Sequence, residues 1–371
     1  MMFFAEKRET EPPRRISYLR VKCKVLCPQR AEKEANGMAD PREEREKLEE
    51  LLVGPLGVRA RDSAGRAVRE EESSLRTCFQ RDADRITHCK AFRRLKHKTQ
   101  VFLQPEGDHY RTRLTHTLEV TRLARTVARA LMLNEDLAEA IALGHDLGHT
   151  PFGHAGERAL NRIYSGGFRH YEQSLRVVDR IEKDGRGLNL CRETRIGILA
   201  HTTGHPEESR ESMVVRLCDH VAYLNHDLDD ALRAGIVTEE EVPDLIHEKL
   251  GTRSSRRIDT FIRDIVDESR GGRVDISEGL RDVWDLFHEF MNERVYRNPV
   301  AKGEEAKVDN ILRGIWDHYY AHPEAMPEDY RAIAERDGLD RAVTDYVSGM
   351  TDDYAIEQYG KIYIPMAWSV K

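Results

Sequence analysis

The stretch LNEDLAEAIALGHDLGHTPFGHAGE, residues 133–157, carries most of the information about the fold. It begins beside Asn134, a favourable N-cap residue, and continues through an apolar run with helical spacing as far as Gly148. Pro151 then interrupts the helical pattern, because proline disfavours helical geometry at the residue before it. The stretch therefore predicts a helix that reaches the core and ends in a polar, glycine-rich loop.

The pattern on either side of this stretch is also helical, from residue 81 onward. Residues 113–133 have apolar side chains near helical spacing at Leu114, Leu118, Val120, Leu123, Val127 and Leu131. Further helical windows are 172–183, 192–201, 212–233, 239–249, 256–269, 277–294, 304–321 and 338–349. Strand-like alternation appears in KIYIPMAW (361–368), where Pro365 allows at most an edge strand. The sequence predicts an all-α fold.

Composition narrows the class of protein. The 59 basic and 66 acidic residues give a net charge of −7, so no global basic field exists to bind nucleic-acid phosphate. No window holds about 18 uninterrupted apolar residues, which excludes a membrane-spanning helix. The six cysteines are scattered and form no CxxC pair, which indicates reduced thiols and a cytoplasmic protein.

Composition and helical pattern also divide the chain into four predicted segments. Residues 1–37 carry nine Lys or Arg and five Asp or Glu and have no helical period, so we expect a disordered tail; Met38 as the true start is the sharper interpretation. Residues 38–80 form a predicted N-terminal helical segment with an apolar face at Leu48, Leu51 and Leu52. The main domain is expected at 81–234 and a helical C-terminal extension at 235–371.

The adjacent pair His145 and Asp146 is the strongest indication of a metal site. Neighbouring helical side chains diverge by about 100°, yet a metal between the two directions is within reach of both. His116 and Asp219 complete a set of two imidazoles and two carboxylates, which suits Mn, Fe, Co, Ni, Zn or Mg. A solvated helix end is the structural alternative for a lone histidine, and a buried apolar role is the alternative for Cys218.

The order His116, His145-Asp146, Asp219 resembles the HD phosphohydrolase superfamily. A larger set of segments, from about residue 78 to 356, resembles the deoxyguanosinetriphosphate triphosphohydrolase-like family of bacteria. These segments are RDADRITHCKAFRRLKHKTQVF (81–102), HTLEV (116–120), GHDLGHTPFGHAGE (144–157), HYEQSLRVV (170–178), AYLNHDLDDALRAG (222–235) and DYVSGMTDDYA (345–355). The resemblance implies an HD-domain helical fold and metal-dependent hydrolysis of a dNTP to a deoxynucleoside and inorganic triphosphate.

The resemblance also implies a catalytic dyad of His154 and Glu157. The physical interpretation agrees, since Glu157 lies three residues further on at the start of the next helix and can orient the imidazole. The alternatives are a glutamate favoured by the helix dipole and a histidine that only binds phosphate. By the same resemblance, Arg113, His149 and His170 face phosphate, and Gln100, Tyr223 and Asp227 surround the deoxyribose.

The sugar contacts have a physical reason, because a ring against C2′ leaves no room for a 2′-hydroxyl. A core tyrosine is the alternative for Tyr223. His220 departs from the family, which often has Arg or Lys there, so we expect a weaker phosphate contact at neutral pH.

The run AFRRLKHKTQ (91–100) is strongly basic, at Arg93, Arg94, Lys96, His97 and Lys98. A solvated helix face is one interpretation, and a phosphate-facing rim or a regulatory dNTP site at a subunit contact is the other. No interleaved aromatic residues offer a stacking platform, so the run does not indicate nucleic-acid binding, although some relatives bind DNA. The resemblance implies a homo-oligomer.

Two other functions remain alternatives to the triphosphohydrolase. One is a different HD-type nucleotidase or phosphodiesterase, which would release phosphate and pyrophosphate. The other is a dNTP-sensing regulatory protein without turnover, which the intact pair of His154 and Glu157 disfavours.

Overall fold

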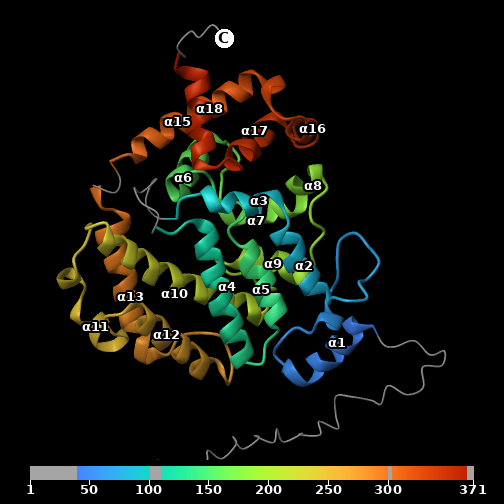
Figure 1. The fold of residues 1–371 in the computed structure, drawn as a ribbon, viewed down its shortest axis with the longest axis vertical. Coiled ribbons are helices and arrows are strands. Elements are labelled where there is room, and N and C mark those ends of the chain that lie inside the picture. The colour runs from blue at the N-terminus through green and yellow to red at the C-terminus, as the bar shows by residue number, and fades with distance from the viewer. Residues whose placement is uncertain (1–39, 101–109, 300–302, 366–371) are drawn as a thin grey trace, which may run out of the picture. The chain divides into compact units, whose positions relative to one another are not determined.

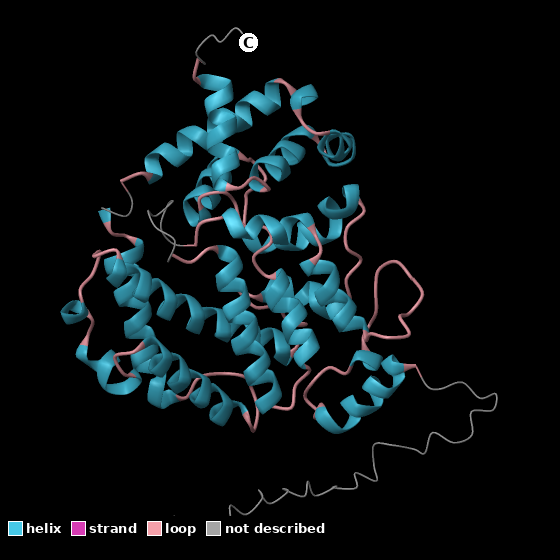
Figure 2. Cartoon of the chain, viewed as in Figure 1, coloured by secondary structure: helices cyan, strands magenta, loops and turns pink. Residues whose placement is uncertain are grey.

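The computed structural model describes residues 40–100, 110–299 and 303–365, all within the compact unit Asp40–Lys371. Figure 2 shows helices joined by loops, and no strand occurs in these three ranges, where the β-type pairing consists of two isolated bridges. The predicted all-α fold is confirmed. The predicted tail at 1–37 lies outside the described residues. No helix of the described part is long and apolar enough to cross a membrane.

The helices of the described residues follow most of the predicted windows, but residues 239–249 divide into a 3₁₀ turn and a helix, and the helix Glu328–Asp337 lies in no predicted window. They are α1 (Pro41–Leu52), α2 (Cys78–Thr87), α3 (Lys90–Arg94), α4 (Arg113–Ala130), α5 (Glu135–Gly144), α6 (Gly153–Ile163), α7 (His170–Arg176), α8 (Glu182–Gly185), α9 (Arg192–Ala200), α10 (Arg210–Arg233), α11 (Asp244–Leu250), α12 (Ser254–Ser269), α13 (Glu278–Met291), α15 (Glu305–Ala321), α16 (Glu328–Asp337), α17 (Leu339–Ser348) and α18 (Asp352–Tyr363). Helices α7 and α13 each continue into a π-helical turn, at Val177–Ile181 and Asn292–Tyr296. Short 3₁₀ turns occur at Ala60–Asp62, Leu95–His97, Glu239–Glu241 and Pro323–Ala325.

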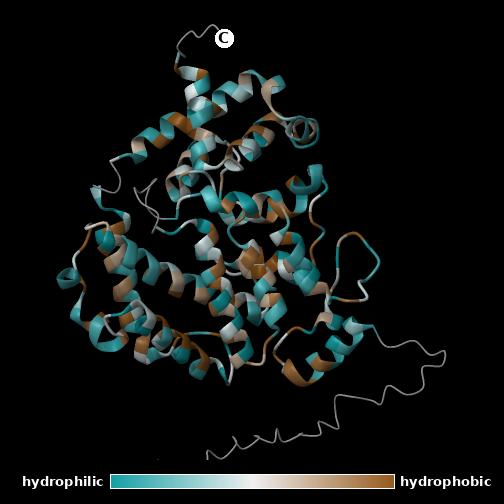
Figure 3. Ribbon diagram, in the orientation of Figure 1, coloured by the Kyte–Doolittle hydropathy of each residue, from teal (hydrophilic) through white to brown (hydrophobic). Residues whose placement is uncertain are grey.

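Three hydrophobic clusters hold these helices together. The largest joins α2, α4, α5 and α10 to α11, α12 and α13. A second packs α6 against α15, α16, α17 and α18. The third lies between α2, α3, the end of α5 and α9. Helix α5 is the most apolar of the central helices, as Figure 3 shows around α5 and α9, and both of its ends are therefore fixed in the interior.

The termini of α4 and α5 are set by local hydrogen bonds. The side chain of Asn134 accepts hydrogen bonds from the backbone N–H groups of Asp136 and Leu137, at 3.0 and 3.2 Å, which confirms the predicted N-cap. Thr112 and Thr115 form a capping box at the start of α4. These caps fix the residues at which the two helices begin. They therefore also fix the positions of the polar residues further along each helix.

The predicted apolar face of α1 is exposed, and so is one leucine of the predicted apolar face of α4. Leu48, Leu51 and Leu52 are exposed, Leu51 by 75%, and the buried residue of α1 is Glu49, whose carboxylate accepts a hydrogen bond from the backbone N–H of Ala60 at 2.7 Å. Helix α1 is thus attached on its polar side. In α4, Leu118 is 46% exposed, whereas Val120 and Val127 are buried as expected, beside small residues such as Ala124 and Ala128, which permit close packing on α5 and α10.

The strand-like interpretation of KIYIPMAW is also wrong where the structure describes it. Residues 361–363 continue α18, because Ile362 follows Tyr359 at helical spacing and both pack on the second hydrophobic cluster. Residues 366–368 lie outside the described part of the chain.

Candidate metal centre and active site

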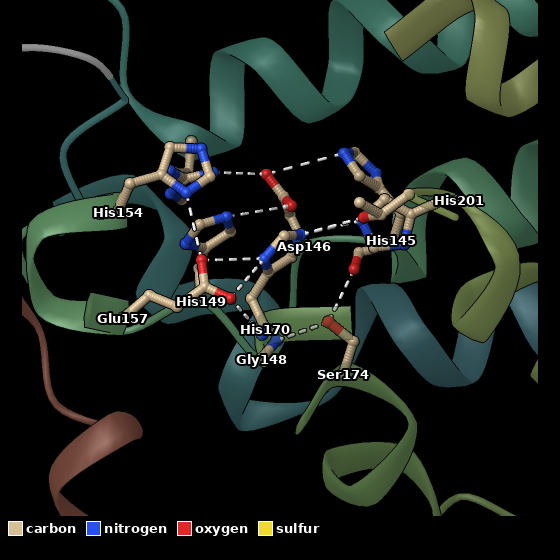
Figure 4. A network of polar contacts seen from close by, with 12 residues as sticks. His145, Asp146, Gly148, His149, His154, Glu157, His170, Ser174 and His201 are labelled. Atoms are coloured by element: carbon tan, nitrogen blue, oxygen red, sulfur yellow. Dashed lines mark hydrogen bonds and ion pairs between the residues drawn. The ribbon is translucent and has the colours of Figure 1, made fainter. Parts of the chain in front are cut away.

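His145 lies at the C-terminal end of α5. One of its ring nitrogens is hydrogen-bonded to the backbone, and the other has no hydrogen-bond partner. Its Nδ1 is 2.6 Å from the carbonyl oxygen of Ala142, so this nitrogen carries the proton and donates it. Its Nε2 is buried, has no hydrogen-bond partner, and lies 3.6 Å from Asp146 Oδ2 and 3.7 Å from Asp219 Oδ1 (Figure 4). A buried lone pair that faces two carboxylates is the expected arrangement of a metal ligand.

The other predicted ligands surround the same point. His116 comes from α4 and Asp219 from α10, and His116 Nε2 lies 2.9 Å from Asp219 Oδ1. One ligand atom from each of His116, His145 and Asp146 lies within 4.8 Å of the other two. The residues therefore fit a divalent metal ion with a mixed nitrogen and oxygen donor set.

Both carboxylates of this cluster are held ionised. Burial raises the pKa of Asp146, but the neighbouring imidazole of His145 and the guanidinium of Arg113 outweigh burial and leave the pKa well below its usual range. For Asp219, burial again raises the pKa, and the hydrogen bond with His116 and the nearby imidazole of His145 bring it below the ordinary value. Two ionised carboxylates are what a metal ligand set requires.

Arg113 places a buried guanidinium beside the metal ligands. Its Nη1 donates to Asp146 Oδ2 at 2.7 Å, and its Nη2 donates to the backbone carbonyl of Gln100 at 3.4 Å. A buried Arg next to one carboxylate retains donors for a phosphate oxygen.

The loop after α5 leads into the predicted dyad at the start of α6. His154 Nδ1 lies 3.1 Å from Glu157 Oε2, and the His154 side chain is 63% exposed and therefore accessible to a bound ligand. Glu157 also accepts from the backbone N–H of His170 at 2.8 Å and from His170 Nδ1 at 3.0 Å. Burial raises the pKa of Glu157, but the hydrogen bonds from His154 and His170 outweigh it, so Glu157 remains a carboxylate.

His201 is a buried histidine of this network that the sequence did not single out. Its Nε2 faces His170 Nε2 at 3.2 Å, and its Nδ1 lies 2.7 Å from the carbonyl oxygen of Ile198 (Figure 4). His145 and His201 are alike, since each follows an apolar helix and bonds the carbonyl three residues earlier. A histidine at the last position of the helical window 192–201 was the available signal.

A cavity of about 500 Å³ opens onto these residues. The predicted site residues that line it are Gln100, Arg113, His116, Asp146, His149, His154, His170, Asp219, Tyr223 and Asp227. His145 and Glu157 lie behind this lining, in contact with residues that form it. Sequence reasoning missed several further lining residues, namely Phe152, Ala155, Arg158, Thr202, Val295, Tyr296 and Glu305.

Part of the cavity wall is aromatic, at Tyr223 and Tyr296. Tyr296 donates to Asp227 Oδ2 at 2.8 Å, while Asp227 Oδ1 is buried without a partner. Burial raises the pKa of Asp227 to about 8, so the group is mostly protonated at neutral pH. The hydroxyl of Tyr223 lies 3.3 Å from His288 Nδ1, so Tyr223 is fixed with its ring on the cavity.

His220, which replaces the basic residue of the family, lines the same wall. Its ring is parallel to that of Trp284, with ring centroids 5.9 Å apart. Burial lowers the pKa of His220, which agrees with the expectation of an uncharged side chain at neutral pH.

Comparison with known families supports this arrangement. Residues 113–224 match the HD domain family, and residues 274–361 match the phosphohydrolase-associated domain. An all-α HD domain with a histidine and aspartate cluster that can hold a divalent metal ion defines an HD-type phosphohydrolase.

The family within this class follows from curated relatives. A deoxyguanosinetriphosphate triphosphohydrolase-like protein of Caldanaerobacter subterraneus subsp. tengcongensis is 50% identical over 328 residues, covering 88% of this chain and 97% of the relative. A protein of the same description from Clostridium perfringens strain 13 is 48% identical over 335 residues, covering 87% of this chain and 98% of the relative. The chain belongs to the deoxyguanosinetriphosphate triphosphohydrolase-like family, as the resemblance predicted.

A solved structure of a hypothetical protein from Aquifex aeolicus also aligns with the chain. It covers 76% of this chain and 71% of its own, with 19% sequence identity and a TM-score of 0.42. This likeness is too weak to bear on function.

Proposed function

We propose that the protein hydrolyses deoxynucleoside triphosphates to a deoxynucleoside and inorganic triphosphate. The observation that supports this proposal most directly is a cavity of about 500 Å³ that is lined by residues of the His/Asp cluster, by His154 of the proposed dyad and by the aromatic side chains Tyr223 and Tyr296. The relatives' description as deoxyguanosinetriphosphate triphosphohydrolase-like agrees with this chemistry.

The proposed metal ligands are His116, His145, Asp146 and Asp219. The metal, when bound, would supply positive charge beside an α-phosphate oxygen. Arg113, His149 and His170 are the proposed phosphate contacts; Arg113 is the permanent cation among them. Burial lowers the pKa of His149 well below its usual range, so His149 contributes a neutral ring whose stacking on His170, with ring centroids 4.2 Å apart, fixes both.

His154 is the proposed proton-transfer group. In the reaction, the oxygen of water attacks the α-phosphorus and the bond from phosphorus to the 5′ oxygen breaks. The deoxynucleoside leaves with a proton on that oxygen, and the three phosphates leave together. With His154 Nδ1 held by Glu157 at 3.1 Å, the exposed Nε2 remains for the proton.

Gln100, Tyr223 and Asp227 are the proposed deoxyribose contacts. A protonated Asp227 can both donate to and accept from a 3′-hydroxyl, and its unpartnered Oδ1 faces no other group. Tyr296, bonded to Asp227, adds a second ring to this wall. A ribose 2′-hydroxyl packed against these rings would lose its hydrogen bonds to water and gain none from the protein. This cost predicts selection for deoxyribose.

Product chromatography tests the proposal. The protein is incubated with each dNTP, alone and in mixtures, with Mg²⁺ or Mn²⁺, and with the matching ribonucleotides as controls. We expect deoxynucleoside and intact triphosphate. Phosphate with pyrophosphate would instead indicate another HD-type nucleotidase, and the absence of any product from every single dNTP and mixture would indicate a sensing protein. Light scattering tests the homo-oligomer that the family resemblance implies, and activity that requires a mixture would indicate a regulatory dNTP.

A further inference from the structure

Two sequence motifs have no part in the site described above, FRRLKHKT (92–99) and DYVSGMTDD (345–353). Lys98, from the first motif, is buried, so its assignment to a solvated face or a phosphate-facing rim is wrong. Its Nζ donates to the backbone carbonyl of Ser348 at 2.9 Å and to the backbone carbonyl of His149. Lys98 therefore joins the end of α17 to the loop that follows Asp146.

Asp352, from the second motif, makes the complementary connection. It is the first residue of α18 and is buried. Its Oδ1 accepts from the backbone N–H of Phe152 at 2.9 Å, and its Oδ2 accepts from the backbone N–H of Thr99 at 3.0 Å and from the Thr99 hydroxyl. One carboxylate thus binds the loop and the segment that carries Lys98.

The loop needs such support because its backbone is strained. Phe152 has a φ of 63° and Gly153 a φ of 55°, so two consecutive residues are left-handed. A side chain in this region costs about 1–2 kcal/mol, which the surroundings must offset. The Phe152 ring is buried in the cluster formed with α15, α17 and α18, which adjoin α6 in Figure 1. His154 follows two residues later.

The other end of the loop is tied to the HD domain itself. The backbone N–H of Gly148 donates to Ser174 Oγ at 2.9 Å, and Ser174 Oγ donates to the carbonyl of His145 at 2.6 Å (Figure 4). One end of the loop is therefore fixed relative to the metal ligands, and the end that leads to the dyad is fixed by the C-terminal helices.

We propose that Lys98 and Asp352 are positioning residues, which hold loop 149–153 so that His154 and Glu157 face the metal ligands. The C-terminal helices, within the segment that matches the phosphohydrolase-associated domain, thereby complete the active site. The kinetic part of this inference rests on the proposed function. The competing explanation is that the buried pair stabilises the fold and has no selective effect on catalysis.

Two buried variants and two exposed controls separate these explanations. In Asp352→Asn, the new amide N–H₂ is a donor and faces at least one backbone N–H, which is also a donor, so at least one hydrogen bond is lost. Lys98→Met removes both hydrogen bonds from Nζ to the backbone carbonyls of His149 and Ser348. Asp353→Asn, at a neighbouring side chain that is 73% exposed, and Lys96→Met, also exposed, are the matched controls. Thr99→Val, which removes only the hydroxyl bond to Asp352, serves as the milder variant if a buried variant does not fold.

The readouts are kcat, KM, metal content and hydrogen exchange of the backbone amides of residues 147–153. For Asp352→Asn and Lys98→Met we expect kcat to fall about 10–100-fold, with KM and metal content within about two-fold of the parent. Exchange should become at least about ten-fold faster in this loop and remain unchanged in α4 and α10. Thr99→Val should shift kcat and exchange in the same direction by a smaller factor, and both controls should match the parent.

Parental kcat, or parental exchange of residues 147–153, in a folded Asp352→Asn protein would overturn the inference. A loss of kcat that is matched by a loss of metal, or by faster exchange throughout the fold, would overturn it in favour of general stability. Exchange is measured without substrate. Faster loop exchange in Asp352→Asn, together with a parent protein that releases no triphosphate, would reject the proposed function and leave the positioning role standing.

Discussion

The Nε2 atoms of His170 and His201 face one another at 3.2 Å. Both Nδ1 atoms already face acceptors, since that of His170 lies 3.0 Å from Glu157 and that of His201 lies 2.7 Å from the carbonyl of Ile198. A hydrogen bond between the two Nε2 atoms then requires one additional proton. Burial, with His145 and His170 close by, lowers the pKa of His201 to about 3, so His201 Nε2 stays unprotonated and can only accept. His201 thus acts as the acceptor that holds His170.

His201→Phe should therefore weaken catalysis without removing the metal. Phenylalanine fills a similar space but accepts no hydrogen bond, which leaves His170 Nε2 with Thr202 Oγ1, 3.3 Å away, as its remaining neighbour. We expect kcat to fall about 5–30-fold, the effect of losing one buried hydrogen bond that orients His170. Metal analysis provides the check. Loss of an ion from His201→Phe would instead make His201 a ligand, since its donor atom lies within 4.8 Å of donors on Asp146 and His170.

Substitution of a proposed metal ligand should, unlike His201→Phe, remove the metal as well as the activity. His145→Ala removes the unpartnered Nε2, and Asp146→Ala removes a carboxylate and also leaves Arg113 without its buried partner. Both variants should lose hydrolysis and bound metal, measured by turnover and elemental analysis. Full activity in a metal-free Asp146→Ala protein would contradict the assignment. His97→Ala, at an exposed histidine on the 3₁₀ turn before Lys98, is the control and should retain both.

The fold and much of the site were predictable because helical periodicity and spacing are local properties. The helical windows, the Asn134 cap and the approach of His145 and Asp146 to the core followed from short stretches of sequence. The meeting of His116 with Asp219 was proposed from the need for further metal ligands and supported by the family resemblance, since 103 residues separate them and no local pattern connects them.

Apart from the strand-like interpretation of residues 361–368, the predictions that were wrong concern which side of a helix packs. Periodicity locates an apolar stripe but does not reveal whether another element covers it. The leucines of α1 are exposed because Glu49 supplies that helix's buried contact, and Lys98 is buried because two carbonyls accept hydrogen bonds from its Nζ. The roles of Lys98, Asp352 and His201 depend on contacts between segments far apart in the chain, which no local pattern encodes.

Leu51 allows a direct test of the exposed face of α1. Because its side chain is 75% exposed, Leu51→Gln should change the free energy of unfolding by less than about 0.5 kcal/mol. Leu160→Ala, in the fully buried position on α6, should cost about 2–5 kcal/mol. Denaturant unfolding of both variants gives the comparison. A cost near that of Leu160→Ala at Leu51 would show that another surface covers α1 in solution.

Asp227 should make stability depend on pH. Burial raises the pKa of its carboxyl to about 8, against about 3.9 in an unfolded chain. Between these values the folded state binds a proton that the unfolded state does not, so stability falls as pH rises. Asp227→Asn cannot titrate. The melting temperature of the parent, relative to that of Asp227→Asn, should therefore decline steadily from pH 5 to pH 8. A constant difference across this range would mean that Asp227 ionises normally.

Variants of His154 and Glu157 distinguish an effect on catalysis from an effect on binding. His154 is exposed to the cavity and is not a proposed ligand, so His154→Ala should cut turnover by about 10²–10⁴-fold while metal content stays near that of the parent. Binding of dNTP to this inactive variant should change little, because Arg113 and the metal ligands remain. Glu157→Gln should lower turnover in the same direction, since an amide cannot accept from His154 and His170 with both oxygens as the carboxylate does.

Arg162→Ala, at an exposed position on α6, is the control for helix integrity. If His154→Ala loses its metal, or turns over at the parental rate, the dyad is wrong, and in the second case His149 on the same loop becomes the next candidate for proton transfer.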